Sequence, residues 1–455
     1  MIEILTSILA FILALGLLVA VHEYGHFWVA RRLGVKVLRF CLGFGKPVWS
    51  KTAGPDQVEY AVAAIPLGGY VKLLDEREGP VPEADKHRAF NNQTTAVRIA
   101  ILAAGPIFNF IFAIAAYWLM FVSGVTTLKP VIGAVEAGSI AAEAGVLAGD
   151  EIVSVDGKDT ASMMAAQLGI LDTLVADGRI VMTVRGSDGR SRSVLIEIDG
   201  ERRSFTEPGE LFPQLGMAPW RPLLPPLIGD VTVGGSADQS GLMSGDLIVT
   251  ADGQPVKDWR EWVDFVRSRP GTVVPLEITR DGSSRPLSLQ IGIVETDEGP
   301  IGRIGAGVSV PEGLYDGMLT EQRLGPLDSL GKAMGRSWEM SSLTVRLIYR
   351  MLRGDVSAKN ISGPINIAQV AGYTARAGLA SFLNFLAIVS ISLGILNLLP
   401  VPMLDGGQIA YQLAEIVKGS PVSERAQMLG QQVGIALLLI LMSFAFYNDI
   451  VNLTG

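Results

Sequence analysis

The chain has 455 residues, of which 49% are hydrophobic and only 18% are charged. Its mean hydropathy of +0.38 is high for a soluble protein and points to membrane-spanning segments. A formal net charge of −8 argues against nucleic acid as a partner. The single cysteine, Cys41, excludes both an intrachain disulfide and a cysteine-rich metal site.

The first apolar stretch begins near Ile4 and continues to Ala30, where Arg31 and Arg32 end it. It exceeds the ~20 residues that a helix needs to cross the hydrocarbon core of a bilayer. Because no basic segment precedes it, a cleavable signal peptide is a poor interpretation. We therefore expect residues 1–32 to form the first transmembrane helix.

A histidine motif lies inside this stretch: the run from His22 to His26 reads HEYGH. On a helix, positions i and i+4 lie about 6 Å apart on one face, so both imidazoles can bind one metal ion. Zinc suits two imidazoles and an oxygen ligand with one position open for water, whose pKa it lowers to ~7. Glu23 can take the proton of that water and deliver it to a leaving amine. The alternative is a pair of interfacial histidines, which the continuing apolar run Phe27–Ala30 disfavours.

The next segment, residues 33–98, is rich in lysine and arginine, and a second apolar span follows at residues 99–125. The positive-inside rule places this basic segment in the cytoplasm, so both termini and the long segment after the second span face outward. A second basic cluster, between Arg323 and Lys359, points the other way, but long translocated segments escape the rule.

The long outward segment contains an internal repeat with an offset of 96 residues. Each copy predicts a short strand, a small-residue helix, a tight turn and a strand that ends in an Asp-Gly turn. The offset is a domain length, so we expect two domains, at residues 126–218 and 224–315, joined by a proline-rich linker. The pattern resembles PDZ domains, which bind an extended peptide as an added strand. The alternative is two β-rich domains that only fill space. The repeated pairs include Gly133 and Gly229, Asp150 and Asp246, and Asp156 and Asp252.

Surface helices and two further spans are expected after the repeat. The surface helices are expected at residues 320–376, with the amphipathic basic part Ser337–Arg353 lying along the outer membrane surface. The later segments are the third span at 377–408, a cytoplasmic loop at 409–428 and the fourth span at 429–449.

A third metal ligand is expected at the end of the third span, where the chain reads NLLPVPMLDGG from Asn397 to Gly407. The two prolines stop a regular helix, and the glycine pair permits a turn or a helix start at Asp405. Since successive spans alternate in direction, Asp405 lies on the same side of the membrane as the histidines. The alternative role of Asp405 is a helix N-cap on a surface loop. His87, in a polar stretch, is interpreted as a solvated loop histidine.

These motifs resemble the site-2 protease family of intramembrane zinc metalloproteases, and the likeness covers essentially the whole chain. It rests on HEYGH and LDG, and on three further stretches: Ile65–Lys72, the run AGPxxN from Ala104 to Asn109, and SGPI from Ser362. The resemblance implies an α-helical membrane protein with four transmembrane helices, a membrane-reentrant β-hairpin and two inserted PDZ-like α+β domains.

The resemblance also implies roles for individual residues. His22, His26 and Asp405 hold Zn2+, and Glu23 is the general base. Asn397 and Pro402 help to position the substrate, and Gly43 and Gly45 belong to the reentrant hairpin, whose exposed strand edge can hold an unwound substrate. For the two glycines an ordinary turn is the alternative.

The expected substrates are single-span membrane proteins already trimmed by another protease, such as an anti-sigma factor after site-1 cleavage, and signal-peptide remnants. The expected location is a bacterial inner membrane, with membrane lipid around the spans and the PDZ pair acting as a size filter in a stress response. Two alternative functions are less consistent with the sequence. A membrane-anchored PDZ adaptor with a vestigial metal site is disfavoured because no ligand is missing. A zincin that cuts soluble peptides is disfavoured because the motif lies in a span.

Overall fold

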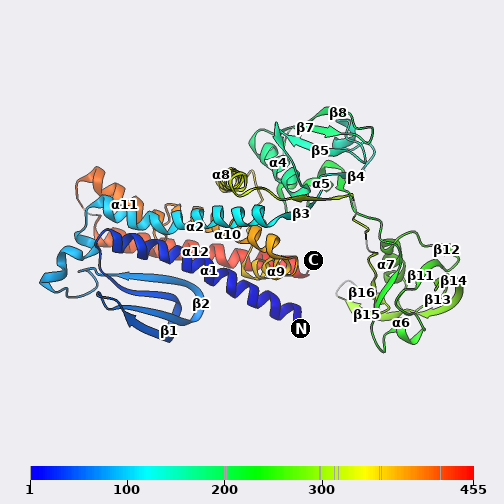
Figure 1. The fold of residues 1–455 in the computed structure, drawn as a ribbon, viewed down its shortest axis with the longest axis horizontal. Helices are drawn as coiled ribbons and strands as arrows, with labels where there is room; N and C mark the ends of the chain where they lie inside the picture. The colour runs from blue at the N-terminus through cyan, green and yellow to red at the C-terminus, as the bar shows by residue number, and fades with distance from the viewer. Residues whose placement is uncertain are drawn as a thin grey trace. The chain divides into compact units, whose positions relative to one another are not determined.

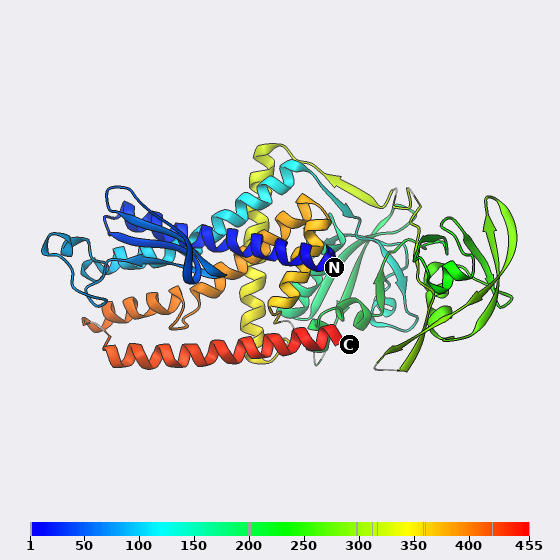
Figure 2. The same ribbon diagram turned by 90° about the horizontal axis from the view of Figure 1, so that it is seen from below.

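The computed structural model describes residues 2–198, 200, 202–296, 299–311, 313–315, 317–357, 359, 361–420 and 422–454. The chain separates into two compact units (Figures 1 and 2). One unit comprises Met1–Ala218 together with Thr320–Gly455, and the other is Pro219–Leu319. The first unit contains every residue proposed above for chemistry.

Within the described residues, four helices are long and apolar enough to cross a membrane. These are α1 (Ile2–Arg32), α2 (Thr95–Ser123), α10 (Leu379–Leu398) and α12 (Glu424–Thr454). Figure 1 shows them running along one common direction. Small residues let α1 and α2 approach closely, as is common for helices in membranes. A Cβ atom at Gly25 of α1 would lie only 2.5 Å from the carbonyl oxygen of Ala104 on α2.

The segment between α1 and α2 forms a long antiparallel hairpin of β1 (Val37–Ala53) and β2 (Val58–Leu73). The register is irregular, because Arg39 pairs with Lys72 and also with Glu59. The hairpin packs on α1 through aromatic rings, with Phe27 centred 5.5 Å from Phe40. The remaining chain before α2 forms two short 3-10 helices, at Glu83–Arg88 and Phe90–Asn92. His87 lies in the first of them and is exposed, as the sequence predicts.

The two copies of the 96-residue repeat contain sheets of the same topology. The sheet of the first domain has the order β6 (Lys158–Asp159), β5 (Glu151–Val155), β7 (Arg179–Arg185) and β8 (Ser191–Glu197). The sheet of the second has the matching order β12 (Gln254–Pro255), β11 (Leu247–Ala251), β13 (Val273–Arg280) and β14 (Ser283–Gln290). Strands β5 and β11 end in the same turn, with φ at Asp156 of 50° and at Asp252 of 51°. The other elements of the first domain are β4 (Ile132–Val135), α3 (Ile140–Glu143), α4 (Met163–Ala176), α5 (Leu211–Leu215) and β9 (Met217–Pro219), with a 3-10 turn at Ser204–Thr206.

The second domain has its own buried core, which includes Trp262, Leu276 and Ile278. Its remaining elements are β10 (Ile228–Val231), α6 (Ser236–Gln239), α7 (Trp259–Arg267), β15 (Gly292–Thr296), β16 (Gly299–Arg303) and β17 (Ala306–Val308). The chain enters and leaves the inserted region through β3 (Val125–Leu128) and β18 (Leu319–Gln322), which pair with each other.

Three more helices pack around the spans: α8 (Pro326–Arg353), α9 (Pro364–Arg376) and α11 (Asp405–Lys418). The buried face of α8 contacts α2 and α10 through Ala333 and Met340, and its other face exposes Trp338 and Leu352. The buried side chains of α8 lie between Ser329 and Leu343 and so overlap only the first part of the predicted segment Ser337–Arg353.

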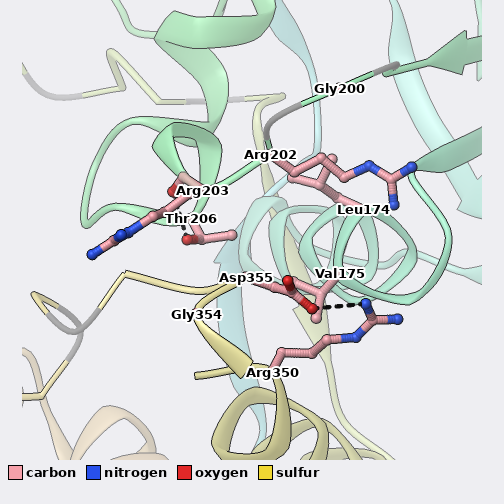
Figure 3. A pocket seen from close by; sticks show the side chains of 9 residues that line it. All are labelled: Leu174, Val175, Gly200, Arg202, Arg203, Thr206, Arg350, Gly354 and Asp355. Atoms are coloured by element: carbon pink, nitrogen blue, oxygen red, sulfur yellow. Dashed lines mark hydrogen bonds and ion pairs between the residues drawn. The ribbon is translucent and has the colours of Figure 1, made fainter. Parts of the chain in front are cut away.

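Polar contacts attach the first inserted domain to the end of α8. Arg350 donates a hydrogen bond to the carbonyl oxygen of Ala176 at 2.7 Å and pairs with Asp355 at 3.1 Å. Lys359 donates to Glu207 at 2.8 Å, and this bond lowers the pKa of Glu207. The junction encloses a cavity of about 250 Å³ (Figure 3). Its described lining contains one carboxylate and no histidine, so it lacks the donor set of a zinc site.

Candidate metal centre

Three metal-binding side chains meet in the first unit. Nε2 of His22 lies 3.2 Å from Oδ2 of Asp405, and Nε2 of His26 lies 3.4 Å from the same oxygen. The two imidazole Nε2 atoms are 3.3 Å apart. These three residues form the one such group of histidine, cysteine or acidic side chains identified in the described part of the chain. The structure therefore brings together the three residues that the sequence predicts as ligands.

Local structure explains how each ligand reaches the site. His22 and His26 lie one turn apart on α1, and their rings meet edge to face with centroids 4.9 Å apart. On the other side, α10 ends at Leu398, ten residues before the predicted end of the third span at 408, because the prolines at 400 and 402 break the helix. The chain then turns into α11, whose first residue is Asp405.

The alternative role of Asp405 as a helix N-cap is wrong. The N-cap of α11 is Leu404, and its side chain makes no capping hydrogen bond. The carboxylate of Asp405 points to the histidines instead. The following glycine pair lets the turn close tightly, since a Cβ atom at Gly407 would lie only 2.6 Å from Cα of Pro402.

The donor set fits a divalent cation. Nδ1 of His26 lies 2.8 Å from the carbonyl oxygen of Ile101 on α2. A carbonyl oxygen only accepts, so Nδ1 carries the proton and Nε2 of the neutral ring presents a lone pair to the site. Oδ2 of Asp405 is buried and has no hydrogen-bond partner among the described residues. Lone pairs that face one another are satisfied by a cation, and two imidazoles with one carboxylate suit zinc.

A cavity of about 590 Å³ opens beside these ligands. It is mostly apolar, and it is lined by α1, both hairpin strands, α2, α10, the turn before α11 and the first residue of α11. Its described lining residues include the three ligands together with Glu23, Phe44, Gly68, Gly69, Tyr70, Asn109, Asn397 and Met403. The acid–base candidate Glu23 and the metal ligands thus face the same space.

Sequence comparison identifies the family of the chain. The family model described as "Peptidase family M50" matches residues 10–441, which is nearly the whole chain. The chain belongs to peptidase family M50.

Curated relatives agree with this assignment. The chain is 44% identical over 458 residues to the "Regulator of sigma-E protease RseP" of Escherichia coli, covering 99% of each chain. It is 42% identical to "Protease RseP" of Yersinia pestis, again over 99% of each chain. A Vibrio cholerae protein with zinc metalloprotease in its name is 42% identical over all of both chains. The M50 chain is therefore a metalloprotease of the site-2 type, as the sequence motifs predict.

One solved structure matches only a part of the chain. It is the PDZ domain of an SdrC-like protein from Listeria monocytogenes, at 20% identity and a TM-score of 0.16. The match covers 20% of this chain and 90% of that domain.

The other residues predicted for this M50 site occupy different places. Asn397 of α10 lines the cavity beside the ligands. Pro402, Gly43 and Gly45 are not among its lining residues. Pro402 packs 3.4 Å from where a Cβ atom of Gly430 on α12 would lie. The two hairpin glycines, both with φ of 91°, flank Phe44, whose side chain does reach the cavity.

Four residues to which the sequence assigns no individual role lie next to the metal ligands or Glu23 in the structure. Gly68 and Gly69 belong to β2, and a Cβ atom at Gly69 would lie 3.0 Å from Cγ of Glu23. Gly105 and Asn109 belong to α2 and contact the histidines. All four residues lie in the stretches Ile65–Lys72 and Ala104–Asn109, which carry part of the family resemblance. Their presence in these stretches is the sequence signal that could have identified them.

Proposed function

We propose that this chain is a zinc-dependent endopeptidase that cleaves peptide bonds inside the membrane. The observation that carries the proposal is the His22, His26 and Asp405 group. Both histidines belong to α1, which is long and apolar enough to span a bilayer, and Asp405 follows the end of α10, a second such helix. Ionisable side chains within a membrane-spanning helix are costly and therefore usually have a function. A hydrolytic site at that position is suited to a substrate that is itself embedded in the membrane.

In this proposal each polar side chain has one role. His22, His26 and Asp405 hold zinc, which when bound acts as a Lewis acid toward the scissile carbonyl and promotes ionisation of water. Glu23 accepts the proton of the attacking water and passes it to the leaving nitrogen as the carbon–nitrogen bond breaks and the carbon–oxygen bond forms. Asn397, with its amide in the same cavity, orients the substrate backbone by hydrogen bonding.

The hairpin supplies a place for an unwound substrate. A transmembrane helix must open before its peptide bond is accessible, and an exposed strand edge can then pair with the opened backbone. Strand β2 brings Gly68 and Gly69 to the cavity, next to Glu23. We propose that the hairpin is membrane-reentrant, that Gly43 and Gly45 give it the bend that directs Phe44 inward, and that Pro402 fixes the turn carrying Asp405.

The proposed location is a bacterial inner membrane, with both termini and the inserted domains in the periplasm. The inserted domains are proposed to be PDZ-like, and to filter substrates by size. The substrates are single-span proteins trimmed beforehand, including an anti-sigma factor after site-1 cleavage, and signal-peptide remnants. The name of the Escherichia coli relative, a regulator of sigma-E, supports this substrate class.

The test uses the full chain in detergent with zinc and a trimmed single-span substrate. Glu23→Gln keeps the size and polarity of the side chain but removes its basicity. We expect cleavage to fall by ~10²–10⁴-fold, the usual contribution of a general base, while zinc content stays unchanged. Undiminished cleavage by Glu23→Gln contradicts the assigned mechanism. A wild-type chain that binds partners but cleaves nothing supports an adaptor role instead.

A further inference from the structure

The two histidine ligands differ in what holds the ring nitrogen that faces away from the metal. For His26 this partner is the backbone carbonyl of Ile101, at 2.8 Å from Nδ1. For His22 it is a side chain, the amide of Asn109, whose nitrogen lies 3.2 Å from Nδ1. Both partners belong to α2. One histidine is therefore oriented by the backbone, and the other depends on the identity of residue 109.

Asn109 is held firmly and is fully buried. Its exposed fraction is 0%, and its backbone carbonyl accepts a hydrogen bond from Ser390 of α10 at 2.8 Å. Its side-chain Oδ1 has no hydrogen-bond partner in the described part of the chain. A buried amide oxygen without a donor costs free energy, so its place beside His22 requires an explanation.

Zinc binding supplies that explanation. A neutral histidine that binds a metal through Nε2 must carry its proton on Nδ1, and that proton needs an acceptor. Oδ1 is the acceptor that Asn109 offers. The oxygen and nitrogen ends of an amide are close in shape, so a half-turn of the side chain brings Oδ1 to His22 without displacing its neighbours.

We propose that Asn109 is a positioning residue of the metal centre, which holds His22 in the Nδ1-protonated form by accepting its proton through Oδ1. The inference rests on the proposed zinc site. It assigns to α2 a second function besides packing, because the same helix orients both histidine ligands. Outer hydrogen-bond partners of this kind typically contribute ~10–100-fold to metal affinity.

The experiment compares three variants of the full chain in detergent by competition for zinc with a chelator. Asn109→Leu has a similar shape but no acceptor, and we expect its zinc affinity to fall ~10–100-fold. Asn109→Asp offers only acceptor oxygens, and we expect it to bind zinc at least as tightly as wild type. The matched control is Asn384→Leu on α10, whose amide lies beside Met164 rather than a metal ligand, and it is expected to leave zinc affinity unchanged.

A second readout is the visible absorption of the cobalt-substituted chain, which reports ligand geometry rather than activity. We expect Asn109→Leu to change this spectrum and Asn109→Asp to preserve it. If Asn109→Leu does not fold, Asn109→Ala makes the same comparison. Equal zinc affinity of the Leu or Ala variant and wild type overturns the role of Asn109, as does a loss in Asn109→Asp equal to that in the Leu variant. A wild-type chain that binds no zinc overturns the proposed function itself.

Discussion

Nε2 of His22 and Oδ2 of Asp405 lie 3.2 Å apart, although the two residues come from opposite ends of the chain. The contact joins α1 to the first residue of α11, and α2 packs against both helices. The ligand set is thus complete only when the helices have assembled. Zinc binding and the packing of the membrane helices should be coupled, because a ligand that binds only the folded state stabilises it.

Removal of the carboxylate ligand should release the metal. We expect Asp405→Ala to lose more zinc affinity than the ~10–100-fold that outer hydrogen-bond partners contribute, because it removes a direct ligand. Metal analysis of the purified variant measures this. Asp355→Ala, which removes a carboxylate at the distant α8 junction, is the control. Full zinc occupancy in Asp405→Ala would show that Asp405 is not a ligand.

A methyl group at position 105 should block the metal centre. A Cβ atom there would overlap Nε2 of His26 and lie 2.7 Å from Cε1 of His22. We expect Gly105→Ala to lose both zinc and cleavage while the chain remains folded, since α2 keeps its helical backbone. Gly16→Ala on α1, where nothing lies within 4 Å of the new atom, should retain both. Normal zinc content in Gly105→Ala would contradict the close contact of α2 with His22 and His26.

The hairpin strand should tolerate no side chain beside Glu23. At Gly69, a Cβ atom would lie 2.8 Å from the carbonyl oxygen of Cys41 and 3.0 Å from Cγ of Glu23. We expect Gly69→Ala to lower kcat/KM by ~10²-fold, the effect of a displacement of about 1 Å at a reacting centre, and to keep zinc bound. Gly79→Ala, in open space, is the control. A wild-type kcat/KM in Gly69→Ala would show that the packing of the hairpin against Glu23 does not contribute to catalysis.

The second inserted domain should lose stability in acid through one ion pair. Asp246 is fully buried, and burial by itself raises the pKa of its carboxyl group. The carboxylate accepts hydrogen bonds from Arg280, at 2.6 Å, and from the Met243 amide, and these lower the pKa by more than burial raises it. Its folded pKa is therefore below the unfolded value of about 3.9. The stabilisation is present above about pH 4 and is lost as pH falls through the folded pKa.

This acid effect is measured by thermal unfolding of residues 219–319, which have their own core. We expect Arg280→Met to destabilise the domain at pH 7 by about 3 kcal/mol, as for a broken buried pair. Asp246→Asn should weaken the loss of stability below pH 4. An unchanged pH profile in Asp246→Asn would assign the acid sensitivity to other groups.

Local spacing made part of this site predictable. His22 and His26 are one helical turn apart, so their shared face follows from the sequence alone. Asp405 follows from the alternating direction of spans and from the proline and glycine residues around it. The repeat that gives the two inserted domains is equally local, because its turns at Asp156 and Asp252 recur at a fixed offset.

The rest depended on how elements rotate against one another. Gly105 and Asn109 reach the histidines only because α2 turns that face toward α1, and residue spacing does not specify this rotation. Likewise, Phe44 lines the cavity while its neighbours Gly43 and Gly45, which have no side chain and a φ of 91°, do not. The family resemblance implied a hairpin but did not indicate which of its residues face the metal centre.

The central claim is hydrolysis within the membrane by the His22, His26 and Asp405 centre. The most direct measurement is mass spectrometry of the products formed from a single-span substrate by the zinc-loaded chain in lipid vesicles. We predict a cleaved bond inside the apolar span of the substrate, with no such product from Glu23→Gln. Cleavage only in the flanking soluble segments, or the same intramembrane product from Glu23→Gln, would contradict this account.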